Sequence, residues 1–146
     1  MKKMIWFDMD GTIADLYGVE NWLDYLIAGD AFPYEAAKPM LNMSLLARYL
    51  NKLLAAGYEI GVISWLSKSS TPEYDELVRA AKLDWLRRHL KSVSFTTIHI
   101  VPYGTDKRAT CGDGILFDDE ERNRNGWGAG AFEPHQILTI LKGMVT

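Results

Sequence analysis

The most constraining feature of the sequence is a short apolar run that ends in two aspartates. Residues 4–7 are apolar and are followed by Asp8 and Asp10, and then by Gly11. A buried strand that delivers carboxylates to its carboxyl end, where a glycine turns the chain, is how open α/β sheets build a site. Aspartate and glycine are also favoured in ordinary turns for local reasons. A second strand that ends in carboxylates, described below, favours the functional interpretation.

Apolar patterns along the rest of the chain alternate between strands and helices. The predicted strands after the first are 58–63, 94–101, 114–117 and an edge strand within 127–132. The predicted helices are 19–28, 40–56, 71–89 and 134–141. This alternation predicts an α/β fold with a doubly wound, mostly parallel sheet and helices on both faces.

One stretch does not fit the regular alternation. Residues 17–40 are interrupted by Gly29, Pro33 and Pro39, and we interpret them as a small helical cap insertion. Since 146 residues suit one domain, we expect a single domain over 1–146 that contains this insertion.

Other polar side chains are predicted at the same sheet edge as the aspartates. Ser64 follows the second strand, and Asp118 and Asp119 follow the strand 114–117. The carboxyl ends of parallel strands meet at one edge, where ligands bind. Ser64 could instead cap a helix, and Asp119 could instead begin a helix, where its charge is favoured by the dipole.

A basic side chain is expected to join this edge from the polar loop predicted at 104–113. Lys107 is the preferred candidate, with Lys82 and Arg108 as alternatives. Converging carboxylates repel one another unless a cation lies among them, and an oxygen-rich site suits Mg²⁺. A lysine and a serine hydroxyl beside the metal would bind a phosphate. A carboxylate can attack phosphorus as a nucleophile, and a second one can transfer the proton.

These residues carry a family resemblance that covers nearly the whole chain. The run from Asp8 to Thr12, Ser64, Lys107 and the pair Asp118-Asp119 resemble, in order, the four motifs of the haloacid-dehalogenase-like superfamily. The resemblance implies that Asp8 is the nucleophile and that Asp10 is the general acid/base. It implies further that Mg²⁺ is held by Asp8, by the backbone carbonyl of Asp10, by Asp118 and by Asp119, directly or through water. Ser64 and Lys107 would bind the phosphoryl group.

Within that superfamily the chain is similar to the 5′(3′)-deoxyribonucleotidase branch. The similarity lies in residues 13–16, in 34–39, and in 115–119 with Asn123 shortly after. The chain departs from that branch in its shorter insertion, in the bulky Trp65 that follows Ser64, and in the acidic residues 120–121 that follow the last motif.

Aromatic, histidine and cysteine side chains leave some alternatives open. Trp22 and Tyr25 of the insertion, together with Tyr34, could cover the site and stack on a base, although aromatic residues at helical spacing are more often core. The three histidines, at 89, 99 and 135, have no metal-ligand spacing and are interpreted as structural. The single cysteine, Cys111, excludes an internal disulfide.

The composition limits the partners. A formal charge of −3 and a pI near 5.6 argue against general binding to nucleic acid or to an anionic membrane. The apolar run before Asp8 is too short for a signal-peptide core, and no run approaches membrane-spanning length, so we expect a cytoplasmic protein, as a monomer or a homodimer.

The sequence therefore predicts a Mg²⁺-dependent phosphatase that hydrolyses a small phosphomonoester through an aspartyl-phosphate. A (deoxy)nucleotide 5′-phosphate is the favoured substrate, but the sequence does not name one. The alternatives are a phosphatase that acts on nucleic-acid ends and a non-catalytic binding domain of the same fold.

Overall fold

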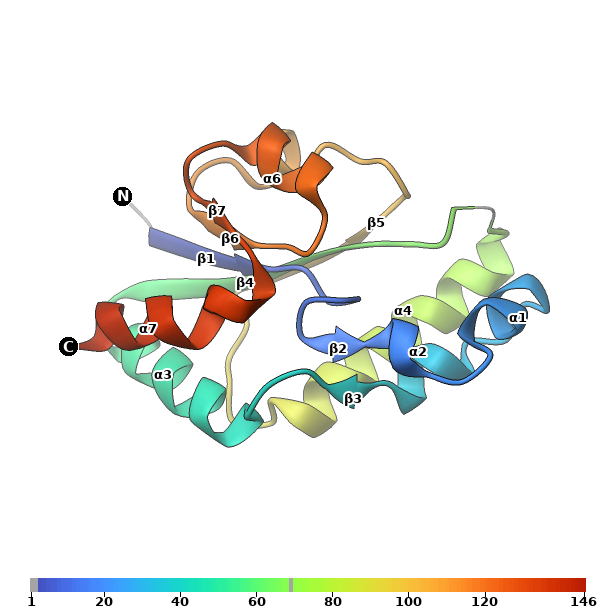
Figure 1. The fold of residues 1–146 in the computed structure, drawn as a ribbon, viewed down its shortest axis with the longest axis horizontal. Coiled ribbons are helices and arrows are strands. Elements are labelled where there is room, and N and C mark those ends of the chain that lie inside the picture. The colour runs from blue at the N-terminus through green and yellow to red at the C-terminus, as the bar shows by residue number, and fades with distance from the viewer. Residues whose placement is uncertain (1–2, 69) are drawn as a thin grey trace.

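The computed structural model describes residues 3–68 and 70–146, and they form one α/β body (Figure 1). The strands are β1 (Lys3–Phe7), β2 (Ala14–Asp15), β3 (Lys38–Pro39), β4 (Tyr58–Trp65), β5 (Thr97–Val101), β6 (Ile115–Phe117) and β7 (Ala131–Phe132). The α-helices are α1 (Trp22–Ile27), α2 (Phe32–Ala36), α3 (Met43–Ala55), α4 (Pro72–His89), α5 (Lys107–Cys111), α6 (Glu121–Trp127) and α7 (Ile137–Val145). Two 3₁₀ turns, η1 (Leu16–Gly18) and η2 (Pro134–Gln136), complete the elements.

The main sheet has five parallel strands in the order β5-β4-β1-β6-β7, so the strand that carries Asp8 is central. Ile5 pairs with Ile60 on one side and with Ile115 on the other. The backbone N–H of Asp8 donates to the carbonyl of Phe117 at 3.0 Å, which brings the ends of β1 and β6 together. The predicted α/β class with a mostly parallel sheet is confirmed.

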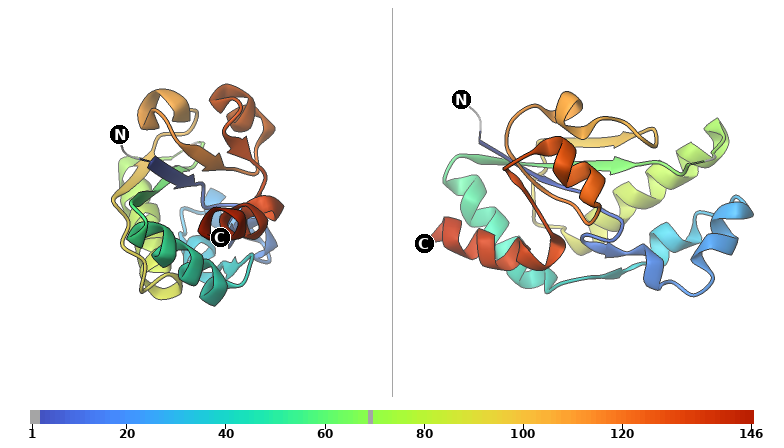
Figure 2. Two further views of the ribbon diagram at one scale, coloured as in Figure 1. Left: turned by 90° about the vertical axis from the view of Figure 1, so that its left-hand side faces the viewer. Right: turned by 45° about the horizontal axis from the view of Figure 1, so that its top comes forward.

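Alternate residues of the strands fill two different cores. Ile5 and Phe7 of β1 face the larger core, which α3, α4 and α7 cover, whereas Trp6 faces the opposite side. There it packs with Trp127 of α6 and with Cys111 of α5. Figures 1 and 2 show α3 and α7 on one side of the sheet and α6 on the other. The helices therefore cover both faces.

The insertion leaves and re-enters the main body through a small antiparallel sheet. Ala14 of β2 pairs with Pro39 of β3, and α1 and α2 lie between these strands. The predicted single helix over 19–28 is wrong in its extent: α1 begins at Trp22 because Asn21 adopts a left-handed conformation, with φ 61°. Pro33 does not break the chain as predicted but lies in the first turn of α2, where its missing N–H costs little.

The helix predicted at 71–89 is confirmed as α4. Thr71 caps it by accepting a hydrogen bond from the N–H of Tyr74 at 3.2 Å, and Pro72 occupies the first turn. The predicted loop 104–113 is partly wrong, because Asp106 caps the short helix α5. The predicted edge strand is shorter than expected, since Trp127 ends α6 and β7 contains two residues. Within residues 3–68 and 70–146, none of the helices combines the length and apolar character that a membrane span requires.

Candidate active site

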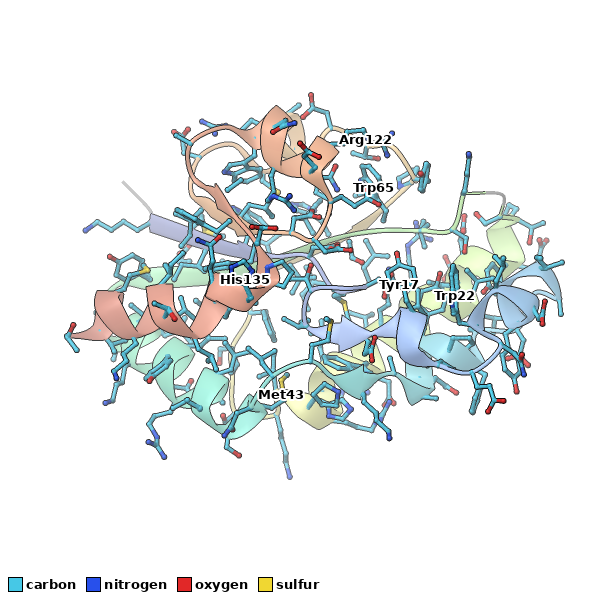
Figure 3. All side chains as sticks on the ribbon, in the orientation of Figure 1. Tyr17, Trp22, Met43, Trp65, Arg122 and His135 are labelled. Atoms are coloured by element: carbon cyan, nitrogen blue, oxygen red, sulfur yellow. The ribbon has the colours of Figure 1, made fainter. Side chains whose placement is uncertain are left out.

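A cavity of about 290 Å³ opens at the carboxyl ends of β1, β4 and β6. Its polar floor includes Asp8, Asp10, Lys107 and Asp119. Aromatic side chains from the insertion, from the end of β4 and from the loop after β5 form its walls: Tyr17, Trp22, Tyr34, Trp65 and Tyr103. Figure 3 shows Trp65 beside Arg122 in the upper part of the view, and Tyr17 and Trp22 below them. The insertion and the α5–α6 side of the protein therefore face each other across this opening.

Three carboxylates gather at the ends of β1 and β6. Asp8, Asp118 and Asp119 each offer an oxygen within 4.8 Å of the other two. Lys107 lies among them and donates to Asp8 Oδ1 at 3.0 Å and to Asp118 Oδ2 at 2.6 Å. Thr12 adds a hydroxyl contact to Asp8 Oδ2 at 3.0 Å and accepts a hydrogen bond from the N–H of Asp119 at 3.1 Å. The two strand ends are thus joined through their side chains.

Gly11 is required for this approach. Its φ of +79° is a conformation that residues with a side chain rarely adopt. A Cβ at this position would collide with Asp119 Oδ2. The glycine after the aspartates therefore makes room for the carboxylate from β6.

Burial and mutual repulsion shift the protonation of these carboxyl groups. Burial, followed by the charge of Asp8, raises the pKa of Asp118 to about 6 and that of Asp119 to about 8. Burial alone would lower the pKa of the Lys107 ammonium, but the carboxylates of Asp8 and Asp118 raise it above its ordinary value. One lysine therefore compensates only part of the negative charge on the floor.

This donor set fits a hard divalent cation. Its ligand atoms are all carboxylate oxygens, the set that Mg²⁺ prefers, and an added cation would relieve the repulsion that raises the two pKa values. Asp118 is held in place by the N–H of Glu120 at 2.9 Å and by the amide of Asn123 at 3.2 Å. Asp8, Asp118 and Asp119 would hold the ion. No histidine or cysteine belongs to a group of three potential ligands within the described part of the chain.

Asp10 lies in a separate environment. Its Oδ2 accepts a hydrogen bond from Lys82 at 3.0 Å, and its carboxylate is outside the cluster of three. Burial raises the pKa of Asp10, Lys82 opposes that shift, and Asp8 adds to it. The two aspartates of the opening run thus have different partners.

No family model matches the sequence, and no curated protein matches it. Among solved structures, the chain is similar to D,D-heptose 1,7-bisphosphate phosphatase from Burkholderia thailandensis, with a TM-score of 0.60, 15% identity and 99% coverage of both chains. That phosphatase belongs to the haloacid-dehalogenase-like superfamily. The chain has the haloacid-dehalogenase-like fold. The fold predicted from the sequence resemblance is confirmed by this likeness, which at 15% identity concerns the fold alone.

The structure brings two of the three basic candidates to the site. Lys107 lies on the cavity floor, as preferred from the sequence, and Lys82 lies beneath Asp10. Arg108 points elsewhere, donating to the carbonyl of Trp127 at 2.8 Å and to Asp113 at 3.0 Å. The alternative that assigned the phosphate to Arg108 does not fit this geometry.

Ser64 is not placed as the sequence predicted. It lies inside β4 rather than after it, is fully buried, and is not among the residues that line the cavity. Its Oγ accepts a hydrogen bond from Lys82 at 2.6 Å. Strand β4 extends to Trp65, and Ser64 lies on the same side of this strand as Ile60 and Val62, which face the core covered by α4. The hydroxyl is therefore not presented to a phosphate in this conformation.

The two aromatic residues predicted to cover the site, Trp22 and Tyr25, lie in different depressions of the surface. Trp22 lines the cavity and meets Tyr17 edge-on, with ring centroids 5.0 Å apart. Tyr25 lies on the other side of the insertion, where it contacts Phe32 and lines a different depression. Only the first of them is placed to contact a ligand. Tyr34, the third candidate, is buried in the cavity wall.

Sequence reasoning missed several contacts of the site. Thr12 was noted only as part of the opening run, and Trp65 and Tyr103 were not proposed as walls. The position of Lys82 had a signal: it lies between Val78 and Trp85 on the buried face of an amphipathic helix, where an unpaired lysine would be costly. Of the remaining candidates, His99 stacks on Trp6, and burial raises the pKa of Cys111 to about 12.

Proposed function

We propose that this protein is a Mg²⁺-dependent phosphatase that hydrolyses a small phosphomonoester through an aspartyl-phosphate on Asp8. The observation that carries the proposal is the arrangement of Asp8 on the cavity floor, between Lys107 and the carboxylates of Asp118 and Asp119. The structural neighbour is by its title a phosphatase, which supports the same reaction class. A non-catalytic binding domain would not need both Asp8 and Asp10 intact.

Lys107 is suited to hold the transferred group. An ammonium has three N–H donors, and two of them serve Asp8 and Asp118. The third is available to a phosphate oxygen in the cavity, where Lys107 would both attract the anion and orient it against Asp8.

The reaction would proceed in two displacements. A carboxylate oxygen of Asp8 attacks phosphorus, the bond from phosphorus to the leaving oxygen breaks with its electron pair on that oxygen, and Asp10 gives it a proton. Asp10 then takes a proton from water, whose oxygen attacks the phosphorus of the aspartyl-phosphate. The bond to Asp8 breaks, its carboxylate is restored, and phosphate leaves. Bound Mg²⁺ would supply positive charge that neutralises the phosphoryl oxygens and the carboxylates.

The walls favour a substrate with a planar group. Tyr17 and Trp22 lie on the insertion side, and Trp65 and Tyr103, whose ring centroids are 4.9 Å apart, lie on the other. Aromatic rings stack on nucleobases, so a (deoxy)nucleotide 5′-phosphate is the proposed substrate. The net charge of −3 does not favour the alternative, a phosphorylated nucleic-acid end.

A phosphomonoester panel with Mg²⁺ tests this proposal. Purified protein should release phosphate from at least one nucleotide or related monoester, and Asp8→Asn should reduce release to background without loss of the folded state, a loss on the order of 10⁴-fold or more. Absence of release from every ester, with folded protein and Mg²⁺, would reject the proposal. Mononucleotides and 5′- or 3′-phosphorylated oligonucleotides of the same base, compared at equal concentration, separate the two substrate classes.

We also propose that the protein acts in the cytoplasm, as a monomer or a homodimer. The single cysteine, which offers no partner for an internal disulfide, supports a reducing compartment. Light scattering of the purified protein would give the oligomeric state, and imaging of a tagged chain in its host would give the location.

A further inference from the structure

Lys82 is a buried cation outside the cavity. It is 1% exposed and lies on the inner face of α4, between Val78 and Trp85. A buried ammonium is costly unless its charge and its donors are satisfied. The structure should therefore contain partners that keep this lysine in place.

Three oxygens surround its Nζ. Lys82 donates to Asp10 Oδ2 at 3.0 Å, to Ser64 Oγ at 2.6 Å and to the backbone carbonyl of Trp65 at 2.8 Å. An ammonium has three N–H donors, so all of them are in use. The ring of Tyr34 covers it, with its centroid 5.1 Å from Nζ. Lys82 thus has no donor left for a phosphate, and it is not among the residues that line the cavity.

These contacts fix one oxygen of Asp10 and leave the other available. Oδ2 is held by Lys82, while Oδ1 has no hydrogen bond from any residue in 3–68 or 70–146. Asp10 itself lines the cavity. Because Lys82 is held in turn by the backbone of β4 and by Ser64, the Asp10 carboxylate is tied to the same sheet that carries Asp8.

We propose that Lys82 is a positioning residue that, with Ser64, holds the Asp10 carboxylate so that its other oxygen faces the leaving group. This inference rests on the proposed phosphatase function and gives Ser64 a role that does not require contact with phosphate. The ammonium of Lys82 remains bound to Oδ2 while the proton moves between Oδ1 and the leaving oxygen or water.

The chemistry of the leaving group provides a test. An alcohol, as in a nucleoside 5′-monophosphate, is a poor leaving group and needs the proton from Asp10, whereas p-nitrophenol leaves readily as the anion. The ratio of kcat/KM for these two esters therefore reports proton transfer by Asp10, and Asp10→Asn gives the reference value for its complete loss. A general loss of stability would lower both kcat/KM values together.

The decisive variant is Lys82→Met, measured with both esters at saturating Mg²⁺. We expect kcat/KM for the alcohol ester to fall about 100-fold and that for p-nitrophenyl phosphate less than about 5-fold, as in Asp10→Asn but to a smaller extent. The effect should appear in kcat, with KM for the alcohol ester nearly unchanged. Trp85→Phe, which alters the same face of α4 without contacting Asp10, should leave the ratio of the two esters as in the wild type.

A second variant covers the case in which Lys82→Met does not fold. Ser64→Ala removes one acceptor of Lys82 and should shift the ratio in the same direction, by about 3- to 10-fold. An equal fall for both esters in Lys82→Met, or an unchanged ratio in both variants, would overturn the positioning role while leaving the phosphatase function intact. A wild-type protein that releases phosphate from no ester of the panel would instead reject the proposed function, and the positioning role with it.

Discussion

Two buried lysines approach the same site from opposite faces of the sheet, and they do different things there. Lys107 comes from α5 and lies among Asp8, Asp118 and Asp119, with two of its three donors in use. Lys82 comes from α4 and holds Asp10 together with the end of β4, with all three donors in use. Both are almost fully buried, at 4% and 1% exposure.

The difference between them separates the two aspartates of one short run. Asp8 belongs to a crowded carboxylate cluster whose charge a single ammonium does not balance, which suits a cation and an incoming phosphoryl group. Asp10 belongs to a simple pair with one lysine, which suits a group that must hold and release a proton. Residues two apart in sequence thus acquire distinct electrostatic environments because helices on opposite faces supply their partners.

The largest expected effect comes from removing the lysine on the Asp8 side. Lys107→Met should lower kcat/KM for every phosphomonoester by about 10³-fold, because both the phosphate clamp and the counter-charge of Asp8 are lost. Arg108→Met, its neighbour on α5, should change kcat/KM by less than about 3-fold, since that side chain points to Trp127 and Asp113. Similar losses of kcat/KM in the two variants would show that Lys107 neither binds the phosphate nor balances the charge of Asp8.

The response to Mg²⁺ should distinguish the two lysines next. Breaking a buried pair costs about 3–5 kcal/mol, so both Lys107→Met and Lys82→Met should lower Tm in the presence of a chelator. Saturating Mg²⁺ should then raise Tm more in Lys107→Met than in the wild type, because the ion replaces the lost charge among the three carboxylates. In Lys82→Met the rise should match the wild type. Equal rises in the two variants would contradict the separation of the aspartates.

A side chain at Gly11 should disturb the contact between the opening run and the end of β6. Gly11→Ala should cost about 1–3 kcal/mol of unfolding free energy and weaken Mg²⁺ binding, because Asp119 must move. Gly29→Ala is the matched control: its φ of +76° is similar, but nothing lies within 4 Å of the added Cβ. It should therefore show the backbone penalty without any change in Mg²⁺ affinity, and denaturant titration with calorimetry would measure both.

The smallest expected effect is the pH dependence of the metal-free protein. Burial and the charge of Asp8 raise the pKa of Asp118 to about 6 and of Asp119 to about 8 in the folded state, above their unfolded value of 3.8. The folded protein then binds more protons than the unfolded chain, so stability is highest at low pH within this window and is lost as pH rises toward about 8. Tm with a chelator should fall between about pH 5 and about pH 8, and saturating Mg²⁺ should remove the decline; a rising Tm would contradict the shifts.

Much of this architecture could be predicted because it depends on local pattern. The apolar strands, the caps of α4 and the aspartates at the ends of β1 and β6 are readable from residue types alone. The insertion was harder, since its bounds depend on the left-handed Asn21 and on Pro33 in a first turn. Neither conformation follows from hydrophobic periodicity.

The errors at the site have a common physical cause, which is side-chain direction. Ser64 was placed correctly along the strand order, but successive side chains of a strand alternate in direction. Its hydroxyl lies on the same side of β4 as Ile60 and Val62, which is the side that α4 covers. Arg108 could not be assigned without knowing which face of α5 packs inward, whereas the apolar face of α4 offered a signal for Lys82 that was not used. Tyr25 and Trp22 share one helix and point to different depressions.

The central claim is that Asp8 accepts the phosphoryl group while Asp10 handles the proton. Acid quenching of Asp10→Asn protein during incubation with p-nitrophenyl phosphate and Mg²⁺, followed by peptide mass spectrometry, tests it directly. This ester needs no proton on its leaving group, so the variant should form the aspartyl-phosphate, and it should hydrolyse it slowly because Asp10 no longer activates water. The account predicts the mass of one phosphoryl group on Asp8, and no such adduct in protein that also carries Asp8→Asn. Phosphate release by the wild type with no adduct on Asp8, or with the adduct on another residue, would contradict it.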